Sequence, residues 1–263
     1  MMSKLISFML VLMMCTGCAR SKIETINMAG STAFQPFAEK LAEVYMAKNP
    51  NIQINVQGGG SAVGIQSAES GVAQIGMVDL VTLSESAEGL NTVVIARDAI
   101  ALIVHPTNKI DNLSTEQIQQ IFIGKIKNWQ EVGGGNKSIT IVSREEGSGT
   151  RDSFEDLVIG EAKINPYALI QDSNGAVKVM VENDPNAIGY LTYGCVTPKV
   201  KAVQIDGIAP TPQNIKEGKY KIIRPIFLLT KEEPSLNVQE FINFMLSQEA
   251  QQIIADNGLI PIR

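Results

Sequence analysis

The spacing of apolar residues changes along the chain, and each spacing predicts a different element. Between Ile52 and Val56 apolar and polar residues alternate, which is typical of a strand with one buried face. Just upstream the apolar residues follow a helical period instead, and they are Phe34, Phe37, Ala38, Leu41, Ala42 and Tyr45. Residues with this spacing share one helix face, so the segment is predicted to pack on a sheet.

Strand and helix signals alternate after residue 23. Strand-like segments cover residues 24–28, 52–57, 72–77 and 93–104, with helical patterns interleaved. This β-α-β-α order predicts an α/β fold with a mostly parallel sheet flanked by helices. Ser114 and Gln117 have the spacing of a helix capping box, and Asn237 and Glu240 repeat it. Asn257-Gly258 is typical of a helix C-terminus.

Two lobes are predicted from the long apolar strands. The strand at 93–104 stops before His105-Pro106, a second α/β run extends to about residue 198, and another apolar strand follows at 222–229. We therefore expect crossovers at 103–106 and 193–199. Residues 23–103 and 200–263 would form lobe 1, and residues 104–199 would form an inserted lobe 2.

The N-terminus has the pattern of a signal segment. Lys4 precedes a largely apolar run from Leu5 to Met14, which is too short to span a bilayer as a helix. It ends in Cys15-Thr16-Gly17-Cys18, which resembles a lipobox. We expect residues 1–17 to be a lipoprotein signal peptide, Cys18 to be lipidated, for example with palmitate, and residues 18–22 to form an anchor segment. The alternative is a plain secretory signal with an incidental cysteine.

Charge and cysteine content narrow the possible partners. The formal charge is −5 and the 263 residues contain no run of Lys or Arg, so a nucleic-acid partner is not expected. With Cys15 removed and Cys18 lipidated, Cys195 alone remains, and it is predicted to be a buried small hydrophobe rather than a nucleophile. No metal-ligand spacing is present, and we expect a monomer without metal, cofactor or catalytic residues.

Three segments share the order strand, Gly/Ser/Thr loop, helix. They are Gly-Ser-Thr-Ala at 30–33, Gly-Gly-Gly-Ser at 58–61 and Gly-Ser-Gly-Thr at 147–150. Free N–H groups and the dipole at a helix N-terminus attract anions, and hydroxyls add uncharged donors. One such loop alone is more simply a helix N-cap. Three of them at the carboxyl ends of strands predict an anion site.

Two charged residues complete this candidate site. The planar fork of Arg144 matches two oxygens of a tetrahedral oxyanion, and we expect it to supply the only full positive charge there. Alternatively, Arg144 forms a surface salt bridge with Glu146 or Asp152, or Glu146 orients it. Asp79, at the tip of a strand, could accept a hydrogen bond from an anion that still carries a proton. Its alternative role is to cap a helix around residues 83–88.

The loop sequences together resemble one family. Gly-Ser-Thr-Ala-Phe-Gln-Pro (30–36), Gly-Gly-Gly-Ser-Ala-Val-Gly (58–64) and Arg-Glu-Glu-Gly-Ser-Gly-Thr (144–150) are similar to the phosphate-binding proteins of bacterial phosphate ABC transporters. Residues 173–177 and 187–191 look like that family's second-lobe segments. The resemblance covers nearly the whole chain after the signal segment. It implies a two-lobed periplasmic-binding-protein fold of type II, with each lobe a mostly parallel sheet flanked by helices.

The resemblance also implies a ligand, partners and site residues. The ligand would be inorganic phosphate, bound between the lobes, and the partners would be the permease subunits of an ABC importer. The protein would lie outside the cytoplasm, in the periplasm or at the cell surface, anchored to a membrane by lipid. The residues implied to bind phosphate are Ser31, Thr32, Ala33, Ser61, Asp79, Arg144, Ser148, Gly149 and Thr150.

Other functions remain open at this point. A serine hydrolase or phosphatase would need a base, but the only histidine is His105 and no Gly-x-Ser-x-Gly elbow is present. The protein could instead bind sulfate or molybdate, but these fully deprotonated anions have no proton to share with Asp79. A surface lipoprotein for sensing or adhesion would lack neighbouring permease and ATPase genes.

Overall fold

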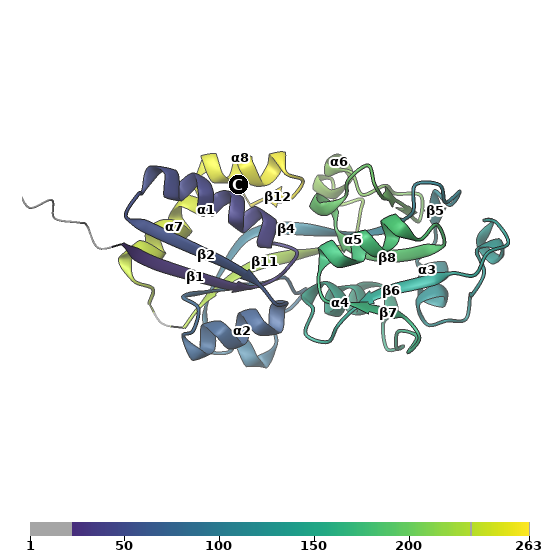
Figure 1. The fold of residues 1–263 in the computed structure, drawn as a ribbon, viewed down its shortest axis with the longest axis horizontal. Coiled ribbons are helices and arrows are strands. Elements are labelled where there is room, and N and C mark those ends of the chain that lie inside the picture. Colours follow the sequence, from purple (N-terminus) through teal and green to yellow (C-terminus); the bar gives the residue numbers. More distant parts are fainter. Residues whose placement is uncertain (1–22, 232, 263) are drawn as a thin grey trace, which may run out of the picture.

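The computed structural model describes residues 23–231 and 233–262, and the elements form two groups in an elongated molecule (Figure 1). The first group contains β1 (Glu24–Gly30), α1 (Gln35–Lys48), β2 (Ile52–Gly58), α2 (Ser61–Ser70), β3 (Ile75–Val78), a 3-10 turn (Glu85–Ala87), α7 (Leu236–Met245), α8 (Gln248–Asp256) and β12 (Ile260–Pro261). Two long strands, β4 (Asn91–Val104) and β11 (Ile223–Thr230), lie where the groups meet.

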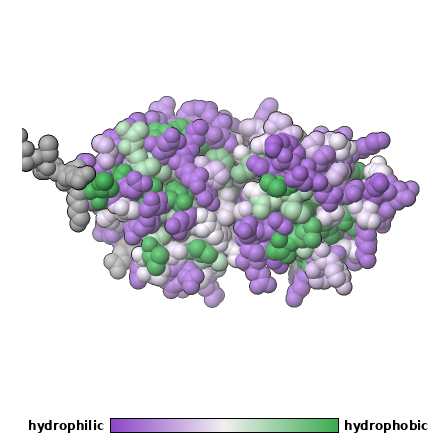
Figure 2. All heavy atoms as spheres, in the orientation of Figure 1, coloured by the Kyte–Doolittle hydropathy of each residue, from purple (hydrophilic) through white to green (hydrophobic). Residues whose placement is uncertain are grey.

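The second group contains the middle of the chain. Its elements are β5 (Asn112–Leu113), α3 (Thr115–Phe122), a 3-10 helix (Trp129–Val132), β6 (Thr140–Arg144), α4 (Gly149–Phe154), a π-helical turn (Glu155–Ile159), β7 (Leu169–Gln171), α5 (Asn174–Asn183), β8 (Ala187–Thr192), a 3-10 turn (Tyr193–Cys195), β9 (Lys201–Ala202), β10 (Gln204–Ile205) and α6 (Pro212–Lys216). Hydrophilic residues cover much of both groups on the face shown in Figure 2.

The main sheet continues from one group into the other through β4. The strand order is β2-β1-β3-β11-β4-β8-β6-β7. β1 is parallel to β2 and β3, and β6 is parallel to β7 and β8. β11 is antiparallel to β3 and to the first part of β4, whereas the end of β4 is antiparallel to β8. The predicted α/β fold with a mostly parallel sheet is confirmed, and its antiparallel strands lie at the junction.

Each group has its own apolar core. In the first, α1 buries Phe37, Leu41 and Tyr45 against the sheet and the C-terminal helices, as its helical period predicts. In the second, Phe122, Phe154 and Tyr190 pack together around the centre of a separate cluster. The largest apolar cluster of each group is therefore separate from that of the other.

The helix-start signals had different outcomes. Ser114 accepts a hydrogen bond from the Gln117 N–H, and the Gln117 side chain accepts one from the Ser114 N–H, so the first capping box is confirmed. The second is wrong, because α7 begins at Leu236 and Asn237 donates to Glu24 instead. Residues that lie between helix and sheet can satisfy their polar groups through tertiary contacts, which overrides the local pattern.

Residues 201–222 lie with the second group. β9 pairs with the end of β4, β10 pairs with β5, and Tyr220 and Ile222 belong to the second core. The limits of the two lobes stay a prediction, and this packing favours a return of the chain near Ile222 rather than at 193–199.

The predicted signal peptide, the anchor segment and Cys18 lie outside the described residues. Within the described part of the chain, no helix has the length and apolar character needed to cross a membrane.

Candidate functional site

The three predicted loops each connect a strand to a helix, as expected. They lie between β1 and α1, between β2 and α2, and between β6 and α4. The second and third loops come from different groups and touch, because the Ala62 N–H donates to the Gly147 carbonyl at 3.1 Å. A Cβ on Gly60 would lie 2.8 Å from the same carbonyl oxygen, so this approach requires glycine.

The first loop is ordered mainly by its own hydroxyls. Ser31 Oγ accepts hydrogen bonds from the N–H groups of Ala33 and Phe34, both at 3.1 Å, and Ser31 is fully buried. Thr32 Oγ1 accepts from Asn174 Nδ2 of α5 at 3.2 Å, which connects this loop to the second group. The structure therefore places Ser31 and Thr32 at the junction, and the Ala33 N–H is used inside the loop.

Ser61, Asp79 and Thr150 come together from three elements. Ser61 Oγ donates to Asp79 Oδ1 at 2.6 Å and accepts from the Asp79 N–H at 3.0 Å. Thr150 Oγ1, from the second group, donates to Asp79 Oδ2 at 3.4 Å. The helix-cap alternative for Asp79 is wrong, because the residue before the 3-10 turn is Ser84.

Arg144 lies at the end of β6 and is 1% exposed. Its Nε and Nη2 donate to Glu145 at 2.9 and 2.7 Å, and they also reach the carbonyls of Gln171 and Asp172. Among the described residues, its Nη1 is buried and has no hydrogen-bond partner. The surface-salt-bridge alternative is thus wrong, and the carboxylate that holds the guanidinium is Glu145 rather than Glu146 or Asp152.

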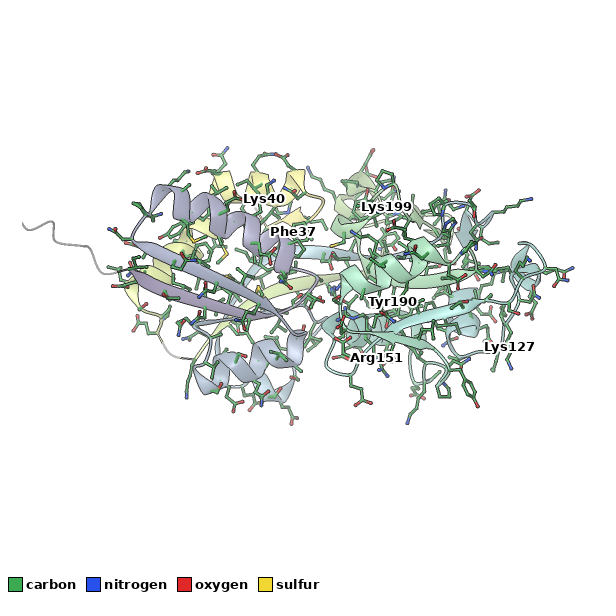
Figure 3. The ribbon with its side chains drawn as sticks, viewed as in Figure 1. Phe37, Lys40, Lys127, Arg151, Tyr190 and Lys199 are labelled. Atoms are coloured by element: carbon green, nitrogen blue, oxygen red, sulfur yellow. The ribbon has the colours of Figure 1, made fainter. Side chains whose placement is uncertain are left out.

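Ser148 and Gly149 form the start of α4. Ser148 Oγ accepts from the Arg151 N–H at 3.3 Å, as an N-cap does. Gly149 presses against the first group, where an added Cβ would lie 2.2 Å from Ser61 Oγ and 2.4 Å from the Asp79 carbonyl oxygen. Arg151 and Tyr190 lie in the part of the second group that faces the first (Figure 3).

A second buried arginine was not predicted from the sequence. Arg224 of β11 is fully buried, and its Nη2 lies 2.5 Å from Asp79 Oδ2 and 2.8 Å from Asp98 Oδ2. The expectation that Arg144 supplies the only full positive charge is therefore wrong. The available signal was charge within two apolar strands, namely Arg97 and Asp98 in 93–104 and Arg224 in 222–229.

Asp98, Thr192 and Asn174 were also missed. Thr192 Oγ1 donates to Asp98, and the Thr192 N–H donates to Asn174 Oδ1 at 3.0 Å. Asn174 Nδ2 in turn lies 3.3 Å from Thr150 Oγ1. Burial raises the pKa of the Asp98 carboxyl, and the Arg224 charge opposes that shift.

A cavity beside Ser61 continues the junction toward solvent. Its volume is about 340 Å³, and Leu80, Thr82 and Asp152 contribute to its lining. Burial, together with the nearby charge of Glu155, raises the pKa of Asp152 to about 6. Since this lining is acidic, attraction of an anion has to come from the loops and arginines deeper in the junction.

The features needed for hydrolysis are not assembled here. His105 Nδ1 bonds to Thr107 Oγ1 at 2.8 Å, and no described hydrogen bond joins it to a loop serine. The described residues contain no group of three His, Cys, Asp or Glu able to hold a metal ion. Cys195 is half-buried, and desolvation raises the pKa of its thiol to about 12, which is typical of an unreactive thiol.

The molecule has two α/β lobes joined by long strands, and hydroxyl-rich loops from both lobes meet near buried arginines. This arrangement defines the class of two-lobed solute-binding proteins. Residues 19–249 match the model of the PBP superfamily domain. The chain is 34% identical over 245 residues to the phosphate-binding protein PstS of Bacillus subtilis, covering 90% of this chain and 81% of that one. The chain therefore belongs to the PBP superfamily and, within it, to the family of the phosphate-binding protein PstS.

Solved structures agree with this assignment. One from Clostridium perfringens, described as a phosphate ABC transporter substrate-binding protein with bound phosphate, is 39% identical with a TM-score of 0.88, over 91% of this chain and 100% of that one. An ABC-type phosphate transport receptor from Vibrio cholerae is 36% identical with a TM-score of 0.74, over 89% and 99% of the two chains. The relatives are named as binding proteins, and the chain is not an enzyme.

The close approach of Gly149 leads to a first prediction. Gly149→Ala would place a methyl group against Ser61 and Asp79, so we expect it to lower the free energy of unfolding by about 1–3 kcal/mol, as overpacking does. Urea unfolding measures this. Gly175→Ala is the control, because its Cβ would have Ser173 Oγ no closer than 3.9 Å. Equal stability of the Gly149→Ala and parent proteins would contradict the tight contact.

Proposed function

We propose that this protein captures inorganic phosphate in the cleft between its lobes, outside the cytoplasm, and delivers it to the permease subunits of an ABC importer. The observation that carries the proposal is the buried Nη1 of Arg144, which lacks a partner among the described residues. An unpaired buried donor costs free energy, so a bound anion is the natural acceptor for it. The names of the PstS relatives support phosphate as that anion.

The chemistry of the junction suits a dehydrated tetrahedral anion. Ser31, Ser61, Ser148 and Thr150 are all buried there, and Gly149 and Ala33 are buried with them. Within the described contacts the hydroxyls of Ser31 and Ser148 only accept hydrogen bonds, so their own protons remain for a ligand. Such neutral donors stabilise an anion without adding charge. We propose that these residues, with Thr32, Asp79 and Arg144, line the phosphate site.

Asp79 adds selectivity to these donors. A carboxylate only accepts hydrogen bonds, so it favours a ligand that carries a proton, as phosphate does at neutral pH. Against sulfate the same carboxylate faces a like charge without a shared proton. We therefore propose phosphate rather than sulfate or molybdate as the ligand.

The remaining parts of the proposal concern anchoring and assembly. We propose that Cys18 carries the lipid after removal of residues 1–17, and that the protein acts as a monomer. We further propose that the two lobes are joined through β4 and through the chain near Ile222, which leads into β11. Rotation about these strands would then open and close the cleft.

Loss of Arg144 tests the site directly. We expect Arg144→Ala to weaken phosphate binding by about 2–5 kcal/mol, the cost of truncating a buried charged hydrogen-bond donor. Calorimetric titration with phosphate measures this change, using purified protein that lacks the signal segment. The control is Lys199→Ala, which removes an exposed cation paired with Glu182 in the same half of the molecule (Figure 3). Unchanged affinity in Arg144→Ala would contradict the proposed site.

Phosphate should be preferred over sulfate by at least about tenfold, because one hydrogen bond to a charged group contributes roughly 1.5–3 kcal/mol. We expect Asp79→Asn to narrow that gap, since an amide no longer repels a fully ionised anion. Parallel titrations with both anions give the ratio of dissociation constants. Asp152→Asn, which removes a neighbouring carboxylate without direct contact, should leave the ratio unchanged. Equal affinities in the parent protein would favour a general oxyanion-binding protein instead.

Membrane attachment should depend on Cys18. The attached lipid chains add about 0.8 kcal/mol for each buried CH₂ group, so Cys18→Ala should release the protein from membranes. Fractionation of cells that express each form provides the measurement. Cys195→Ala removes the other cysteine of the exported chain and should stay membrane-bound. If Cys18→Ala also remains with the membranes, the lipid-anchor proposal is wrong.

A further inference from the structure

Arg224 and Asp98 form a buried ion pair on the two strands at the junction. They are direct register partners on β11 and β4, and both are fully buried. Arg224 Nε and Nη2 donate to Asp98 Oδ2 at 3.1 and 2.8 Å. Thr192 donates to the other carboxylate oxygen of Asp98. Asp98 therefore holds the guanidinium in a defined orientation.

The Nη1 and Nη2 groups of this guanidinium contact Asp79. Arg224 Nη2 lies 2.5 Å from Asp79 Oδ2, and Nη1 donates to the Asp79 carbonyl oxygen at 3.1 Å. Nη2 also donates to Thr150 Oγ1 at 3.0 Å. Each nitrogen of Arg224 thus already has an acceptor within the protein, in contrast to Arg144, whose Nη1 lacks one among the described residues.

These contacts determine what Asp79 can do. A carboxylate offers about four acceptor positions. Among the described side chains, Ser61 donates to Oδ1, while Thr150 and Arg224 bind Oδ2. One position on Oδ1 is then left for a proton carried by a ligand.

We propose that Arg224 is a positioning residue that makes the site select a protonated anion, by holding the Asp79 carboxylate turned so that a single acceptor position remains. This inference rests on the proposed phosphate-binding function. It assigns the selectivity to a pair of residues on different strands, Asp79 and Arg224, rather than to Asp79 alone. Asp98 anchors the pair to the crossover strand β4.

A charge-matched double variant tests the proposal. Asp98→Asn combined with Arg224→Gln removes one negative and one positive charge and leaves two amides able to bond across the strands. Asp79 then loses the guanidinium that contacts its Oδ2 and its carbonyl oxygen, so the remaining acceptor position is no longer held in place for the proton of phosphate. We expect the sulfate-to-phosphate ratio of dissociation constants to fall about tenfold, the effect of losing one charged hydrogen bond.

The single variant Arg224→Lys provides a second test that keeps the charge. An ammonium is a point charge and cannot hold both carboxylates as the planar fork does, so the ratio should fall by about threefold or more while staying above that of the double variant. In a protein that already carries Asp79→Asn, adding either variant should leave the sulfate-to-phosphate ratio unchanged, because Arg224 acts through Asp79. If the double variant does not fold, as judged by thermal unfolding, the Arg224→Lys ratio decides.

The results separate this inference from the proposed function. A purely structural Arg224 would weaken phosphate and sulfate by the same factor and leave the ratio at the parent value, which would overturn the inference alone. A parent protein that binds neither anion would contradict the proposed function, and the inference with it. A fall in the ratio that persists when Asp79 is already Asn would also overturn it, because the effect would then not pass through Asp79.

Discussion

The junction between the lobes depends on the burial of the Arg224 guanidinium between two carboxylates. A charge taken out of water is costly unless it is paired and hydrogen-bonded, and removing one partner leaves the other uncompensated. Arg224 takes its hydrogen-bond acceptors from three elements. They are β4, through its register with β11, the chain after β3, and α4. These contacts bring residues of both groups together at one buried polar centre.

The candidate anion site combines this fixed centre with donors that carry little net charge. The protein has a formal charge of −5, and Glu145 already pairs with Arg144. Attraction must therefore come from local, oriented donors, namely Arg144 Nη1, which has no partner in the described part of the chain, and the buried hydroxyls of Ser31 and Ser148. Oriented dipoles in a dry site hold an anion more strongly than the same groups in water would. A mildly acidic protein can thus bind an anion.

Close contact between the lobes is achieved by backbone rather than by side chains. Gly60 meets the Gly147 carbonyl, and Gly149 lies against Ser61 and Asp79, with no room for a Cβ at either place. Gly30, at a φ of +132°, similarly brings the first loop against Met77 of β3. Glycine permits both the positive φ and the short distances, so donors from the two lobes can face the same small volume.

Local pattern was sufficient for the elements and for the loops between them. The helix period of α1, the capping box at Ser114 and the three strand–loop–helix segments depend on neighbours in sequence, and all were predicted. The partner of Arg144, the Arg224–Asp98 pair and the antiparallel direction of β11 were not. Arg224 and Asp98 are 126 positions apart, and only the strand register makes them adjacent. Sequence shows that a charge lies in an apolar strand, but the charge that neutralises it is chosen by tertiary packing, because pairing energy depends on distance and burial.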